Sequence, residues 1–93
     1  MRNVHVTVTG DVQGVGYRYT LRLVATEAGV GGWVRNLRDG SVEASLAGPD
    51  DAVSRVLAWM GDGPPGAHVA GLRVSERTDS GDAADGFDVR PTG

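Results

Sequence analysis

Cysteine and lysine are both absent from this sequence of 93 residues, and each absence excludes a group of functions. Without cysteine there is no disulfide framework, no thiolate metal site and no cysteine nucleophile. The nine basic residues are all arginines, so a Schiff-base lysine and the lysine of a Walker phosphate loop are excluded as well. Any chemistry in this chain must depend on other side chains or on the backbone.

Long apolar runs and an excess of positive charge are missing too. Val4, Val6 and Val8 alternate with polar residues instead of forming the apolar stretch of a signal peptide, and no run approaches the roughly 20 apolar residues of a membrane-spanning helix. We therefore expect a cytoplasmic protein with no membrane partner. The net charge is −3, and the arginines are spread from Arg2 to Arg90 among acidic neighbours, which predicts no nucleic-acid partner.

The length and the 40% hydrophobic content predict a single domain over residues 1–93, in which strands and helices alternate. Period-two valines indicate a strand over residues 4–9, and apolar residues at helical spacing indicate helices over 17–28 and from 50 to about 60. Further strands are expected over 33–38, 41–47 and 69–77, with a two-residue turn at Asp39-Gly40 and a short edge strand at Phe87 and Val89.

The resulting order, β-α-β-β-α-β, predicts an α+β fold. It is typical of a ferredoxin-like two-layer sandwich, in which two helices cover one face of a mainly antiparallel sheet. This fold hosts enzymes, RNA-binding domains and regulatory modules, so the fold class alone does not specify the function.

Neither the histidines nor an acidic segment near the C-terminus is spaced like a metal site. His5 and His68 are far apart in the sequence, and the segment 79–86 is a short glycine-rich stretch that we interpret as a mobile loop. Its carboxylates, Asp79, Asp82 and Asp85, lack the regular spacing and the bidentate glutamate of a calcium loop. We predict no metal and no cofactor.

The segment from Gly10 to Arg18 is the most informative part of the chain. It holds Gly10, Gly14 and Gly16 between a predicted strand and the start of a predicted helix. Main-chain N–H groups curled at such a place form a concave anion site, to which the helix dipole adds partial positive charge. Arg18 could fold its guanidinium over the bound anion with paired hydrogen bonds. The sequence therefore predicts an anion-binding loop.

Here the chain resembles the acylphosphatase family. That family's first signature, G-x-V-Q-G-V-x-[FY]-R, is matched at every specified position from Gly10 to Arg18. Its second signature begins at Gly32-Trp33-Val34-Arg35-Asn36 and continues through Gly40, Val42 and Gly48. Two separated motifs in suitable structural contexts are far more specific than one glycine-rich pattern.

The resemblance implies hydrolysis of a carboxyl-phosphate bond without a metal or a covalent intermediate. It assigns phosphate binding and catalysis to Arg18 and the positioning of water to Asn36. The phosphate-binding loop that it implies comprises Gln13, Gly14, Val15, Gly16, Tyr17 and Arg18. Asp11 falls at a variable position of the signature, where a carboxylate would oppose the approach of an anion. The partners implied are a small-molecule acyl phosphate and inorganic phosphate, and we expect a monomer.

Two other functions compete with this hypothesis. A phosphate-binding or regulatory module would keep the anion site without turnover, but it would need no side chain to position water, as Asn36 does in the family. An RNA-binding domain of this fold would need exposed aromatic side chains on the first and third strands. His5, Thr7, Glu43 and Ser45 occupy those positions instead.

Overall fold

The structure, a computed structural model, describes residues 2–77 and 86–93. The elements in this part of the chain are β1 (Arg2–Asp11), α1 (Tyr17–Ala28), β2 (Gly31–Asn36), β3 (Val42–Gly48), α2 (Asp50–Asp62), β4 (His68–Glu76) and β5 (Phe87–Val89). The predicted order of strands and helices is confirmed, including the short last strand. Of the predicted loop over residues 79–86, only Gly86 is described, so its three aspartates fall outside the described residues.

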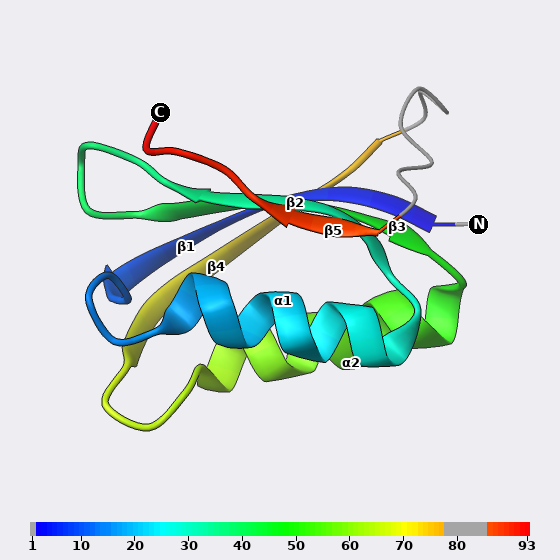
Figure 1. Ribbon diagram of the computed structural model, residues 1–93, viewed down its shortest axis with the longest axis horizontal. Coiled ribbons are helices and arrows are strands. Elements are labelled where there is room, and N and C mark those ends of the chain that lie inside the picture. The colour runs from blue at the N-terminus through cyan, green and yellow to red at the C-terminus, as the bar shows by residue number, and fades with distance from the viewer. Residues whose placement is uncertain (1, 78–85) are drawn as a thin grey trace.

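The strands form one sheet in the order β4-β1-β3-β2-β5. β1 pairs antiparallel with β3 and β4, and β3 pairs antiparallel with β2, whereas β5 pairs in parallel with β2. Because β1 and β2 both run antiparallel to β3, they run in the same direction. Their carboxyl ends therefore reach the same edge of the sheet, where the β1–α1 loop and the β2–β3 hairpin lie (Figure 1).

Both helices cover one face of this sheet (Figure 1). Leu21 of α1 and Val53, Val56 and Met60 of α2 are fully buried against the valines of the strands. Apolar residues at period 3.6 in the helices and at period two in the strands meet in one layer, and burial of each large apolar side chain contributes about 1.5–3 kcal/mol. The predicted ferredoxin-like α+β sandwich is confirmed.

The β2–β3 connection differs from the predicted two-residue turn at Asp39-Gly40. The Gly40 N–H donates to the Leu37 carbonyl (3.2 Å), which puts Arg38 and Asp39 at the centre of the turn and Gly40 after it. Gly40 has a φ of 94°, and every residue with positive φ in the described part of the chain is a glycine. The predicted turn type requires a positive φ at Asp39 as well. A three-residue turn avoids that strain by placing only glycine in the left-handed region.

β1 also continues beyond Gly10, where the sequence predicts its end. An irregularity between Thr9 and Gly10 lets the strand stay paired with β4 as far as Asp11. Gly10 has a φ of 119°, and a Cβ placed on it would lie 2.2 Å from the carbonyl oxygen of His68. This glycine therefore serves the close approach of two strands, and the loop predicted to bind an anion begins after it.

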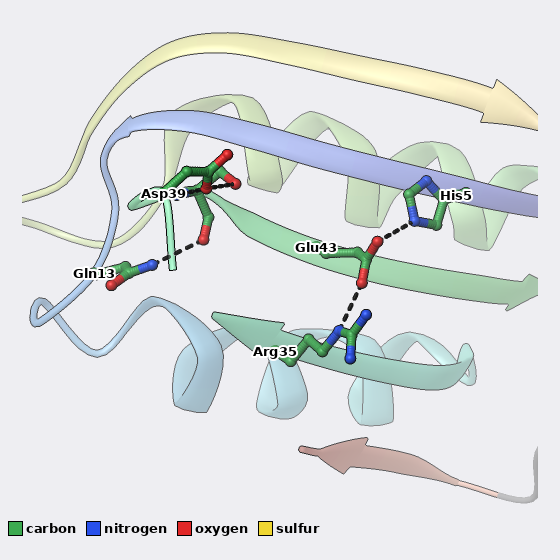
Figure 2. Close-up of polar contacts among 6 residues, drawn as sticks. His5, Gln13, Arg35, Asp39 and Glu43 are labelled. Atoms are coloured by element: carbon green, nitrogen blue, oxygen red, sulfur yellow. Dashed lines mark hydrogen bonds and ion pairs between the residues drawn. The ribbon is translucent and has the colours of Figure 1, made fainter. Parts of the chain in front are cut away.

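The face of the sheet opposite the helices is polar. Glu43 of β3 lies between His5 of β1 and Arg35 of β2, with His5 Nε2 2.9 Å from one carboxylate oxygen and Arg35 Nε 2.7 Å from the other (Figure 2). Beside them, the Trp33 ring has the guanidinium groups of Arg35 and Arg90 at 5.5 and 4.7 Å from its centroid. Polar contacts thus connect β1, β3 and β2 on the face that no helix covers, and a cation–π contact connects β2 to the residue that follows β5.

Candidate active site

The loop between β1 and α1 presents main-chain N–H groups at the start of a helix. Gly14 and Gly16 both have a φ of 77°, in the left-handed region that favours glycine. Gly16 is also the N-cap of α1, where no side chain accepts a hydrogen bond from the helix, and the first turn contains no acidic residue. The N–H groups of the first turn, together with the positive end of the helix dipole, therefore form a site suited to an anion.

A cavity of about 140 Å³ adjoins this loop. It is lined by Val12, Gly14, Gly16, Tyr17, Arg18, Tyr19, Asn36 and Val89. The half-buried Arg18 forms no ion pair with any residue in the described ranges, so its guanidinium is free to bind an anion in the cavity. The structure thus brings together Arg18 and Asn36, the two residues to which the family resemblance assigns catalysis.

Asn36 is the last residue of β2 and presents an unusual polar atom. Its Oδ1 is buried and has no hydrogen-bond partner, alone among the buried side-chain nitrogens and oxygens of residues 2–77 and 86–93. An unpaired buried polar atom costs about 1–3 kcal/mol, so its presence calls for an explanation. Asn36 is also one of the residues that line the cavity. The main-chain carbonyl of Asn36 is itself fixed by the Gly93 N–H at 3.0 Å.

Three other residues of the predicted phosphate-binding loop direct their side chains elsewhere. Gln13 Nε2 donates hydrogen bonds to two carbonyl oxygens of the β2–β3 hairpin, one of which is drawn in Figure 2, and Val15 packs against the core. Tyr17 is buried, its hydroxyl donates to the Met60 carbonyl at 2.7 Å, and burial raises its pKa. Any contact of these three residues with an anion would therefore come from their main-chain N–H groups.

Sequence reasoning did not place Val12, Tyr19 or Val89 at this site. Val12 and Tyr19 directly flank the segment from Gln13 to Arg18, so their position in the sequence was the available signal. Val89 belongs to β5, which reaches the cavity only because it pairs in parallel with β2. Asp11, whose carboxylate would oppose an anion, is exposed and is not among the residues that line the cavity.

A larger hollow of about 360 Å³ lies over β1 and β4, lined by Thr7, Thr9, Gly71, Leu72 and Arg73. Size alone does not make it the functional site. Its lining residues include neither the glycine-rich loop nor a residue with a buried unpartnered polar atom, and the single residue of that kind in the described part of the chain, Asn36, lines the smaller cavity. The smaller cavity is therefore the candidate active site.

The described part of the chain contains neither a cluster of metal ligands nor a membrane-spanning helix. Among the residues that the structure describes, no three histidine, aspartate or glutamate side chains are grouped so that they could hold a metal ion. None of the described helices is both long enough and apolar enough to span a membrane.

Comparison with known proteins agrees with the geometry. The sequence model of the acylphosphatase family matches residues 4–89. The chain is 53% identical over 89 residues to acylphosphatase 2 of Ralstonia nicotianae, an alignment that covers 96% of this chain and 93% of that protein. It is 49% identical over 89 residues to the acylphosphatase of Pyrobaculum calidifontis, and this alignment covers 95% of this chain and 80% of the relative.

Solved structures give the same result. The crystal structure of acylphosphatase from Bacillus subtilis superposes with a TM-score of 0.92 at 31% sequence identity, covering 97% of this chain and 99% of that chain. The similarity to acylphosphatases in sequence and in fold therefore extends along nearly the whole length of the protein. The chain belongs to the acylphosphatase family, and it is a hydrolase.

Proposed function

We propose that this protein hydrolyses the carboxyl-phosphate bond of acyl phosphates to a carboxylate and inorganic phosphate. The observation that carries the proposal is that Asn36, whose Oδ1 is buried and unpartnered, lines one cavity together with Arg18 and the first turn of α1. A site that only bound phosphate would need the Arg18 guanidinium and the main-chain N–H groups. It would not need an unpaired hydrogen-bond acceptor beside them.

The phosphoryl group is bound by donors from one continuous segment. In this proposal the main-chain N–H groups of residues 13–18 contact its oxygens, and the Arg18 guanidinium adds two parallel hydrogen bonds and a full positive charge. Gly14 and Gly16 allow the backbone to turn its N–H groups inward, because both are in the left-handed region. Charge on the phosphoryl oxygens is thereby neutralised as the bond to the carboxylate lengthens.

The attacking water is oriented by Asn36. Its Oδ1 accepts one hydrogen bond from the water and leaves a lone pair of the water oxygen directed at phosphorus, in line with the bond that breaks. The water oxygen forms the new bond to phosphorus, the carboxylate leaves with the electrons of the broken bond, and a phosphate oxygen accepts the proton of the water. Because a carboxylate is a good leaving group, no strong base is required.

The same proposal covers the setting in which the enzyme works. It acts as a monomeric single domain over residues 1–93 in the cytoplasm, with a small-molecule acyl phosphate as substrate and phosphate as product. It uses no metal and no cofactor, and it engages neither nucleic acid nor membrane. The net charge of −3 supports the absence of a nucleic-acid partner.

One assay tests the reaction class. Initial rates are measured with benzoyl phosphate and with p-nitrophenyl phosphate, a phosphate monoester, in the presence of a metal chelator. Hydrolysis of benzoyl phosphate alone is expected. Hydrolysis of both would indicate a general phosphatase, and activity that the chelator abolishes would contradict the metal-free mechanism. Phosphate binding without turnover of either compound would identify a binding module.

A further inference from the structure

The two halves of the proposed site lie on elements that do not pair with each other. In the sheet, β3 separates β1 from β2, so the strands that lead to the loop and to Asn36 are two strand spacings, about 10 Å, apart. The ladder between β1 and β3 ends at Val8–Val42, and that between β2 and β3 ends at Asn36–Val42. Beyond these pairs, the sheet does not fix the distance between the loop and Asn36.

The side chain of Gln13 spans this gap. Its Nε2 donates to the Leu37 carbonyl at 2.8 Å and to the Ser41 carbonyl at 2.9 Å, on either side of the β2–β3 turn. A primary amide nitrogen carries two hydrogens, so each is used once. The same two carbonyls close the hairpin, because the Leu37 oxygen accepts from the Gly40 N–H and the Ser41 oxygen accepts from the Leu37 N–H. Leu37 directly follows Asn36.

The hairpin end of this bridge is itself fixed. Asp39 Oδ1 accepts hydrogen bonds from the Ser41 N–H at 2.9 Å and from the Ser41 hydroxyl at 2.5 Å. Ser41 is 4% exposed. Figure 2 shows Gln13 and Asp39 approaching the start of β3 from opposite sides. A continuous chain of hydrogen bonds thus runs from the β1–α1 loop to the tip of the hairpin.

We propose that Gln13 is a positioning residue that holds Asn36 at the correct distance from the phosphate-binding loop. The inference rests on the proposed function, because it needs Asn36 to orient the attacking water. The side chain of Gln13 acts only through the hairpin. The phosphate-binding groups of the proposed function belong to one continuous segment, residues 13–18, to which Gln13 contributes only its main-chain N–H, whereas its side chain bonds to the hairpin that directly follows Asn36.

Loss of the Gln13 bridge should therefore lower kcat and leave the affinity for phosphate nearly unchanged. Gln13→Met keeps the length of the side chain and removes both donors. We expect kcat for benzoyl phosphate to fall about 10-fold, because a small displacement of a group that orients the nucleophile is costly. The inhibition constant of inorganic phosphate should stay within about twofold of the original protein. The buried Val53→Ala on α2 is the control for lost stability, and it should leave kcat unchanged.

A double-mutant cycle separates positioning from a general structural role. If Gln13 acts through Asn36, the Gln13→Met loss should nearly disappear in an Asn36→Ala background. A loss of full size in that background would overturn the inference, as would an unchanged kcat in Gln13→Met or a parallel loss of phosphate affinity. Should Gln13→Met fail to fold, the exposed Asp39→Ala tests the same chain of bonds, with an expected loss of about threefold in kcat and none in phosphate affinity.

The same measurements distinguish a failure of the proposed function from a failure of the role of Gln13. If the original protein does not hydrolyse benzoyl phosphate, or if Asn36→Ala is as fast as the original, the water-positioning mechanism is wrong and the role of Gln13 is wrong with it. If the original protein is active and Asn36→Ala is slow, but Gln13→Met matches the original, only the role of Gln13 is wrong.

Discussion

Arg18, the second residue of α1, and Asn36, the last residue of β2, line the same cavity, although β3 lies between the strands that lead to them. One supplies a permanent positive charge and the other a neutral, buried acceptor. In the proposed mechanism, binding of the anion and orientation of the nucleophile therefore fall to different residues, and their substitution should change different kinetic constants.

Replacement of Arg18 by alanine should weaken both phosphate binding and turnover. The variant loses paired, charge-assisted hydrogen bonds, so we expect kcat/KM for benzoyl phosphate to fall by about 100-fold or more and the phosphate inhibition constant to rise at least about 10-fold. The matched control is Arg22→Ala, which removes the same charge one turn along α1 from an exposed residue outside the cavity. Equal losses in the two variants would show that net charge, not the contact made by Arg18, is responsible.

Replacement of Asn36 by alanine should reduce turnover and spare phosphate binding. Without Oδ1 the water is no longer oriented, and kcat should fall by about 100-fold or more while the phosphate inhibition constant changes less than about twofold. Steady-state kinetics with phosphate as competitive inhibitor measures both. In Asn36→Asp the new negative charge should also weaken phosphate binding. Undiminished turnover in Asn36→Ala would remove the role in positioning water.

Two glycine substitutions should change stability in opposite directions. A Cβ added at Gly14 would meet no atom within 4 Å, but the φ of 77° at this position is unfavourable for alanine. The Gly14→Ala substitution should therefore lower the free energy of unfolding by about 1 kcal/mol. Gly61→Ala lies in α2, also without neighbours within 4 Å and without a positive φ. It should raise the free energy by about 0.5–1 kcal/mol, because alanine favours helix. Urea denaturation of both variants measures the difference, and a stabilised Gly14→Ala would show that the loop does not require the left-handed conformation.

Acid should destabilise the protein partly through Glu43. Burial acts to raise the pKa of this carboxyl, but the hydrogen bonds from Arg35 and His5 outweigh it and hold the pKa below its usual 4.5. A pKa that is lower in the folded than in the unfolded protein adds stability above pH 4.5, and this stability is lost as the pH falls through the folded value.

Thermal unfolding of Glu43→Gln measures this contribution. The variant should be less stable than the original protein at neutral pH, and the difference should shrink in acid. Glu76→Gln is the control: its ion pair with Arg2 is exposed, and its substitution should have a smaller effect that salt reduces further. A difference between Glu43→Gln and the original that is the same at all pH values would contradict the assignment.

Local sequence determined the order of the elements and pointed to the segments that form the proposed site. The alternating valines of β1 and the helical spacing of Tyr17 and Leu21 predict their elements, because side-chain periodicity is a property of each segment alone. Arg18 and Asn36 could be named in advance for another reason, since each lies in a motif that resembles a signature of the acylphosphatase family.

Tertiary structure decided which atoms meet. The direction of the Gln13 side chain depends on two carbonyls in a distant hairpin, and the presence of Val89 in the cavity depends on β5 pairing with β2. The row formed by His5, Glu43 and Arg35 likewise requires three strands in register. Such contacts join residues far apart in the chain, and their energies depend on burial and on exact distances that no local pattern encodes, so they exist only once the sheet has assembled.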